Sequence, residues 1–201
     1  MVTNTFYLKT LLSFLVLVLC GVFFSCKNSH AFEKYVKELD SLKIVVEQAV
    51  DNFKTVDSAA CMNAYSKQIT YTDFINKNLK DTITKTAAEN VQAFYKTGNG
   101  FKSYLSMRSQ WLKDAGLSIK QLSNLSHDLK NKSIETEDAI GYINTEKRSA
   151  EKIIEELKIN TEAIRAHLEL YTKSLPATED LVRRLNNGSL PALQQPDLNS
   201  K

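Results

Sequence analysis

Histidine is scarce in this chain, and its three histidines lie far apart in the sequence. None of His30, His127 and His167 has a glutamate three residues before it, so the Glu-x-x-His pair of di-iron bundles is missing. The His-Glu-x-x-His zinc motif, the glycine-rich phosphate loop and the Gly-x-Ser-x-Gly nucleophile turn are missing as well. The sequence therefore predicts no catalytic residue, no metal site and no cofactor, and we expect a protein that is not an enzyme.

Carboxylates gather between residues 151 and 162, where four glutamates occur within twelve positions. Paired carboxylates act as general acid and base only in a desolvated pocket. Here Lys152 and Lys158 alternate with the glutamates at salt-bridging spacing. This pattern predicts a solvated helix face rather than an active site.

The three cysteines of the chain, Cys20, Cys26 and Cys61, are expected to have different fates. Cys61 lies beside Met62 and near Tyr65 at helical spacing, which predicts a small core residue rather than a reactive thiol. Cys20 and Cys26 lie in or just after an uncharged apolar run at residues 11–24. That run is shorter than the roughly 20 residues of a spanning helix, and it fits the apolar region of a secretory signal.

The end of this run, Val22-Phe23-Phe24-Ser25-Cys26, places a small residue directly before a cysteine, and Lys27 then begins a polar stretch. It resembles the lipobox of bacterial lipoproteins. Phe23 and Phe24 stand where leucine and a small residue are commoner, and in this the segment is similar to the looser lipoboxes of the Bacteroidetes. The resemblance implies cleavage between Ser25 and Cys26, and lipidation of Cys26 by a diacylglyceryl thioether and by fatty acids such as palmitate.

Two other interpretations of the amino terminus stay open. The run could be a short uncleaved anchor, or an ordinary signal that is cut after Ala31, with Ser29 as the second small residue. If Cys26 is lipidated, the protein belongs to the bacterial cell envelope and is held to a membrane by its acyl groups. In some Bacteroidetes lipoproteins, acidic residues directly after the lipidated cysteine mark export to the cell surface. Lys27, Asn28 and Ser29 are not acidic, so the resemblance implies a protein that faces the periplasm.

The composition of the chain limits the fold classes that are possible. In 201 residues there are 26 Lys and Arg against 23 Asp and Glu, a formal charge of +3, which is too small for a strong nucleic-acid footprint. Only six glycines and three prolines occur, and all three prolines lie after residue 175. So few turn-forming residues favour one all-α domain.

Apolar residues recur at alternating steps of three and four over residues 32–56 and again over residues 140–175. Extra apolar residues at Val36, Val45 and Val50 widen the first stripe beyond a two-helix seam, as a bundle helix requires. In the second stripe, Lys147 and Thr161 are polar. We therefore predict an up-down antiparallel bundle of about four long helices, with an extended antiparallel coiled-coil hairpin as the alternative.

Several features of the sequence indicate where helices could end. Gly98-Asn99-Gly100 is the strongest turn in the middle of the chain, and weaker breaks fall near residues 56–58 and 131–136. At Gly116 a break and a continuous helix are equally compatible with the sequence. The expected parts are a signal peptide (1–25), a lipidated linker (26–30), a bundle (31–175) ended by Pro176, a short helix (176–188) and a flexible tail (189–201).

Residues 27–201 resemble no specific family. The expected function is therefore that of a lipid-anchored helical envelope protein, acting as a binding, scaffold or accessory module for an envelope protein partner. The alternative is a structural coiled-coil protein that self-associates into homo-oligomers through the incompletely apolar seams.

Overall fold

The computed structural model describes residues 29–80 and 82–198, and it is all-α in these ranges. Its four helices are α2 (Ser29–Lys54), α3 (Ser58–Asn78), α4 (Lys85–Lys130) and α5 (Thr136–Leu185). The prediction of a four-helix all-α bundle is confirmed. Two of the helices are very long, at 46 residues for α4 and 50 for α5. With a rise of 1.5 Å per residue, α5 extends about 75 Å.

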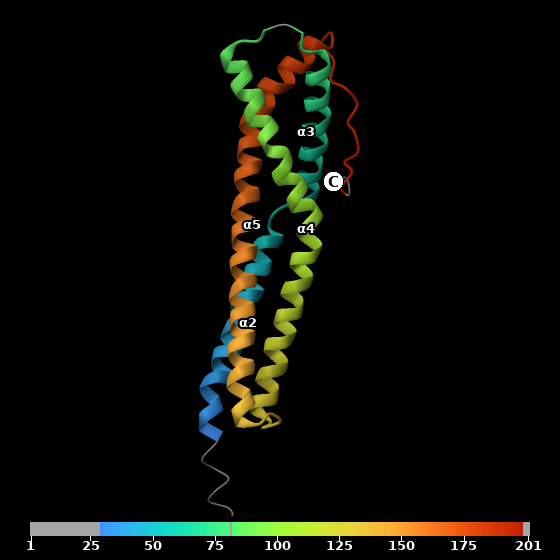
Figure 1. The fold of residues 1–201 in the computed structure, drawn as a ribbon. Helices are drawn as coiled ribbons and strands as arrows, with labels where there is room; N and C mark the ends of the chain where they lie inside the picture. The colour runs from blue at the N-terminus through green and yellow to red at the C-terminus, as the bar shows by residue number, and fades with distance from the viewer. Residues whose placement is uncertain (1–28, 81, 199–201) are drawn as a thin grey trace, which may run out of the picture.

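The helices form a narrow rod in which α4 and α5 make a long hairpin (Figure 1). Helices α2 and α3 follow one another along this hairpin, each packing against both α4 and α5 but not against each other. The rod is therefore three helices thick along its length. Because α2, α3 and α5 run in one direction and α4 in the other, the expected strict up-down alternation is replaced by two helices in succession on a coiled-coil-like hairpin.

The predicted turn at Gly98-Asn99-Gly100 is wrong, because α4 runs through all three residues. These glycines let neighbouring helices come close. A Cβ at Gly98 would lie 2.5 Å from the amide oxygen of Gln68 on α3, and one at Gly100 would overlap the imidazole ring of His167 on α5. Gly116 also lies inside α4, in open space, so the helix is continuous there.

Among the described helices the chain reverses between α3 and α4, where no break was predicted, and again at residues 131–135, where one of the two weaker breaks was predicted. Asn131 ends α4, and Lys132 adopts a left-handed φ of 55°. Ser133 then donates a backbone hydrogen bond of 2.9 Å to the carbonyl of Asp128. The turn thus satisfies carbonyls at the end of α4 without a glycine.

The predicted break near residues 56–58 is also confirmed. Asp57 caps α3, since its carboxylate accepts hydrogen bonds of 2.8 and 3.1 Å from two N–H groups of the first turn. At the end of α2, the Arg165 guanidinium of α5 donates to Asn52 Oδ1 at 2.9 Å and to Thr55 Oγ1 at 2.8 Å. The junction between α2 and α3 is therefore held by the Asp57 cap of α3 and by Arg165 of α5.

The end of the last helix departs from the prediction. Pro176 lies inside α5, which continues to Leu185, so the expected short helix at 176–188 is the last part of α5. Helix α5 bends toward α3 near this end (Figure 1), as expected where a proline removes one backbone donor. The bend brings Glu179 to Lys67 of α3 at 3.0 Å and to the Tyr71 hydroxyl at 3.1 Å.

The core follows the predicted stripes for most of its length. Phe53 packs edge-on against Trp111 with ring centroids 5.8 Å apart, and Phe94 stacks on Tyr171 at 5.6 Å. Ile140 departs from the stripe because it is 49% exposed. Other apolar residues with at most 2% of their surface exposed include Leu39, Val46, Ile75, Phe101, Ala115, Leu122, Ile143, Ala150, Leu157, Ile164 and Val182.

Candidate functional site

The predicted lipidation and cleavage residues, Cys26 and Ser25, lie outside the described residues. The first described helix, α2, begins at Ser29, three positions after Cys26 in the sequence. Two of the five residues expected to form the linker, Ser29 and His30, therefore belong to α2. Within the described part of the chain, none of the helices is both long enough and apolar enough to cross a membrane.

Cys61 is fully buried and free, as expected for a core residue. Burial raises the pKa of its thiol to about 11, and the nearby Asp57 carboxylate acts in the same direction. Because the thiolate is the reactive form of cysteine, this side chain is held in its unreactive thiol form near neutral pH.

The described histidines and glutamates do not converge on a site. His127 is exposed at the end of α4, where its ring is 3.7 Å from Asp128, whereas His167 packs against Gly100 and Phe101. The glutamates of residues 151–162 lie on the outer side of α5 and are exposed or half-buried. Among residues 29–80 and 82–198, no three potential metal ligands come together.

Two adjacent exposed apolar residues form a short ridge on α2. Ile44 is 51% exposed and Val45 is 42% exposed, and the exposed Ser41 and Gln48 continue the ridge on either side. We call these four residues the α2 ridge. Val45 was predicted to belong to the core-facing stripe, and its 42% exposure shows that this prediction is wrong. The uncharged neighbours Ser41 and Gln48, one helical turn away on each side, are the signal that could have revealed an outward face.

A groove of about 520 Å³ separates the ridge from α5. Within it, the Lys147 ammonium lies 2.9 Å from the Glu38 carboxylate, so the polar position in the predicted seam serves to pair α5 with α2. This contact lowers the pKa of Glu38 and raises the pKa of Lys147. Leu42 and Val45 supply the apolar part of the groove.

A second groove, of about 400 Å³, separates the ridge from α4 and includes Ile44 and His127. Here the Asp40 carboxylate accepts a hydrogen bond of 2.7 Å from the Ser126 hydroxyl and one of 3.0 Å from the Lys130 ammonium. The hydrogen bond from Ser126 is the main cause that lowers the pKa of Asp40, and Lys130 adds to it. The ridge is therefore an aliphatic strip between two grooves with fixed charges.

A third cavity, of about 260 Å³, lies between α4 and α5 beside their connecting turn. Tyr142 on its wall is 54% exposed. The Oε2 atom of Glu146 is buried there without a hydrogen-bond partner, and burial raises the pKa of this carboxyl. A buried carboxylate oxygen without a partner disfavours the charged form, which is the cause of the raised pKa of Glu146.

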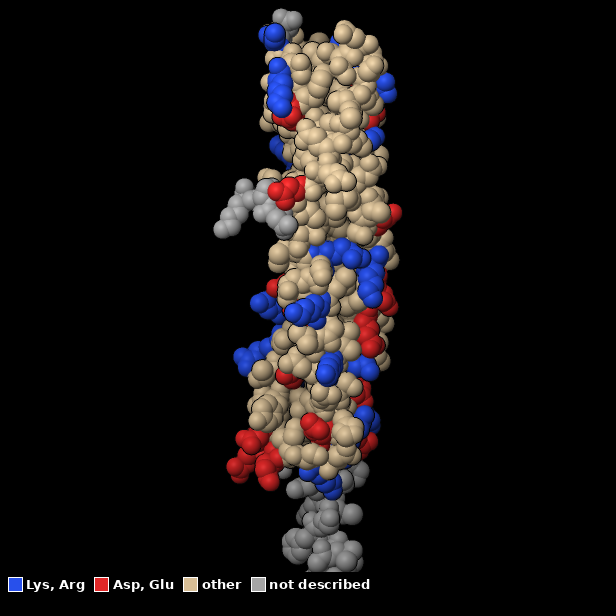
Figure 2. All heavy atoms as spheres, turned by 90° about the vertical axis from the view of Figure 1, so that its right-hand side faces the viewer, with Lys and Arg blue, Asp and Glu red and all other residues tan. Residues whose placement is uncertain are grey.

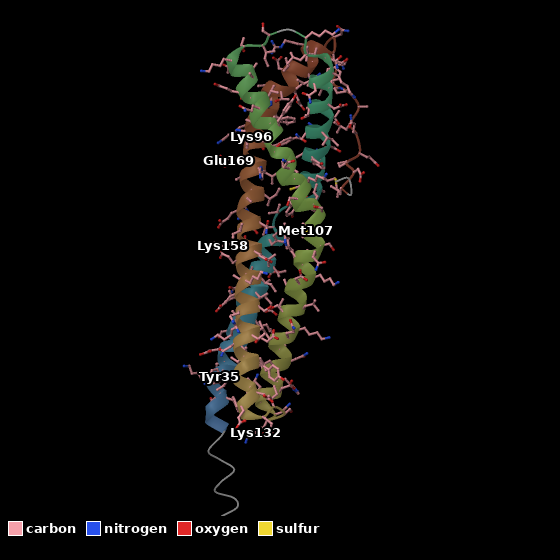
Figure 3. All side chains as sticks on the ribbon, in the orientation of Figure 1. Tyr35, Lys96, Met107, Lys132, Lys158 and Glu169 are labelled. Carbon is pink, nitrogen blue, oxygen red and sulfur yellow. The ribbon has the colours of Figure 1, made fainter. Side chains whose placement is uncertain are left out.

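The start of α2 and the α4–α5 turn lie at the same end of the rod. Figure 3 shows Tyr35 of α2 and Lys132 of the turn near this end, and Lys96 toward the opposite end. On the face shown in Figure 2, charged side chains are dense over the lower half and sparse over much of the upper half. On this face, the two halves of the rod therefore differ in charge.

The chain matches no protein-family model, no curated protein and no solved structure. The surface features of the described residues are therefore the available indication of function. This surface carries two grooves, the α2 ridge between them, and the ion pairs that join α2 to α4 and α5.

Proposed function

We propose that this protein is a lipid-anchored helical rod of the bacterial cell envelope that acts by binding, as a scaffold or accessory module. The observation that carries the proposal is the Ser25-Cys26 pair at the end of an uncharged apolar run, three positions before the first described helix. Membrane attachment is the expected consequence of this arrangement, and the α2 ridge with its two grooves supports the binding role.

The short stretch of chain between Cys26 and α2 determines which end of the rod would face the membrane. Three residues span at most about 11 Å, so a lipidated Cys26 would hold the start of α2 and the α4–α5 turn close to the membrane surface. The opposite end of α5 would then stand up to about 75 Å away. Such a rod positions binding surfaces at defined heights above the membrane.

The α2 ridge suits a partner that is itself bound to the membrane. Ile44 lies 15 residues after Ser29, which places it about 23 Å along the helix from the anchored end. Confinement of both proteins to one surface raises their effective concentration, so a small contact area can suffice. The exposed pair Ile44 and Val45 supplies the apolar contact, and the flanking charged grooves supply specificity.

The anchor is tested by Cys26→Ala, with Cys20→Ala as the matched control within the same apolar run. Wild type and the control are expected to incorporate radiolabelled palmitate and to fractionate with membranes, whereas Cys26→Ala loses both properties. Label on Cys26→Ala would remove the basis of the proposal.

The binding surface is tested in the same cells with a photo-crosslinking residue at Gln48. A heterologous crosslinked product that disappears with Ile44→Arg supports the proposed partner. A product with twice the mass of the chain would instead favour self-association through the ridge. The matched control is a crosslinker at the exposed Lys158 on α5, which is expected to give neither product.

A further inference from the structure

The C-terminal tail, which was predicted to be flexible, is docked on α3 over its described residues 189–198. After α5 ends, Gly188 takes a φ of 91° and donates to the carbonyl of Arg183 at 2.7 Å, which closes the helix. The following residues then descend beside α3, antiparallel to it (Figure 1). Residues 189–198 have no regular secondary structure, so their backbone groups need partners from elsewhere.

Two hydroxyl groups of α3 bind a single residue of this tail through its backbone. Ser66 Oγ donates to the carbonyl of Gln194 at 2.7 Å, and the N–H of Gln194 donates to Thr70 Oγ1 at 2.9 Å. The side-chain amide of Gln194 also donates to Asp73 at 3.2 Å. Ser66, Thr70 and Asp73 lie at helical spacings of four and three and therefore share one face of α3.

The Thr70 hydroxyl is fixed in its role as acceptor. It donates its own hydrogen to the carbonyl of Ser66 at 2.7 Å, which leaves a lone pair for the tail N–H. Thr70 is only 2% exposed. The two hydrogen bonds to the backbone of Gln194 do not depend on the side chain of that residue, whereas the contact with Asp73 does.

Apolar contacts flank these hydrogen bonds on both sides. Leu190 and Leu198, at either end of the docked stretch, pack against the hydrophobic core. Pro191 and Pro196 lack a backbone donor and favour extended backbone, so they reduce the entropy lost when the segment docks. The docked segment itself is almost uncharged, since Asp197 is its only ionisable side chain.

We propose that this face of α3 is a recognition site for an extended peptide that is largely uncharged and contains leucine and proline. In the free protein the chain's own residues 189–198 fill the site. A partner segment of the same chemistry binds by displacing the tail, which is tethered and so competes at an effective concentration on the order of millimolar. This inference extends the proposed binding function but does not depend on lipidation of Cys26.

The test uses a fluorescent peptide with the sequence of residues 189–198 and the full chain in detergent. Gln194→Pro in the chain removes the donors to Thr70 and Asp73 and leaves the α3 face unchanged. Each lost hydrogen bond corresponds to a factor of about five. We therefore expect the peptide to bind Gln194→Pro at least five-fold more tightly than wild type in fluorescence anisotropy.

Adding Thr70→Val or Ser66→Ala to Gln194→Pro removes the acceptor or the donor on α3, and each is expected to weaken binding about five-fold. Circular dichroism checks that both double variants remain folded, and Ser66→Ala keeps the test valid if Thr70→Val does not fold. Absence of binding to Gln194→Pro at millimolar peptide, or equal binding of a scrambled peptide, would overturn the proposal. Failure of Cys26 lipidation would leave these results unaffected.

Discussion

Gly100→Ala tests the close packing of α4 against α5. In an exposed helix interior, replacing glycine with alanine stabilises a protein by about 0.8–1 kcal/mol, because alanine has the higher helix propensity. At Gly100 the new methyl group would overlap the ring of His167. The ring is half-buried and lies beside Phe101, with centroids 6.4 Å apart, so it can move only by disturbing this packing.

The two effects oppose one another, and the packing effect is the larger. Overpacking in a filled interface costs about 1–3 kcal/mol, so the expected net loss of stability is about 1 kcal/mol. For a chain of this size that corresponds to a melting temperature lower by about 2–4 °C. Gly116→Ala is the matched control, since a Cβ there meets nothing within 4 Å on the same helix. It should gain about 1 kcal/mol.

Urea denaturation followed by circular dichroism at 222 nm measures both variants. Repeating the pair in a His167→Ala background closes a double-mutant cycle. Without the imidazole ring, Gly100→Ala should become as stabilising as Gly116→Ala. If Gly100→Ala already stabilises the wild-type protein by the same amount as the control, the register of α4 on α5 described above is refuted.

Three further predictions concern the ion pairs, the thiol and the helix cap. The pKa values of Glu38 and Asp40 are lowered in the fold, so these carboxylates add stability above the pKa of the unfolded chain, and this stability is lost as the pH falls through the folded pKa. Thermal scans should therefore show a melting temperature that drops below about pH 4, and a smaller drop for Asp40→Asn; an identical pH profile for the variant would contradict this. Cys61, with a pKa of about 11, should react with a thiol reagent at pH 8 only as fast as the mature chain unfolds, and rapid labelling of the native protein would show that the site is open. Asp57→Ala removes the cap of α3 and should cost about 1 kcal/mol in urea denaturation, whereas Asp57→Asn should retain most of the stability; equal losses for both would mean that the cap hydrogen bonds are unimportant.

The parts of the fold that local sequence encodes were predictable. The stripes on α2 and α5 follow from the period of the helix, and the break before α3 coincides with a capping aspartate. The α3–α4 connection at residues 79–84 has neither glycine nor proline, and it was not predicted. Its visible signal is Thr84, whose hydroxyl accepts from the N–H of Ala87 at 3.3 Å.

The errors arise where tertiary contacts override local preference. Gly98 and Gly100 look like a turn in the sequence, but their missing side chains leave room for Gln68 and His167 on other helices. Pro176 was predicted to end the helix. Instead α5 bends near this proline and continues, and the contacts of Glu179 with α3 lie beyond the bend. No local pattern identifies partners that lie far away in the chain.

Of the two candidate binding surfaces, one follows from the local sequence and the other depends on tertiary contacts. Exposure of Ile44 follows from its position off the seam, whereas docking of the tail required knowing that Ser66 and Thr70 of α3 lie next to Gln194. These residues are separated by more than 120 positions. Only the fold brings them together.

Mass spectrometry of the mature amino terminus tests the central claim most directly. The lipid-anchored rod predicts a chain that begins at Cys26 and carries a diacylglyceryl thioether with further acylation. A chain that begins at Phe32 would indicate an ordinary signal cut after Ala31, and one that begins at Met1 an uncleaved anchor. Either result would contradict a membrane attachment through Cys26.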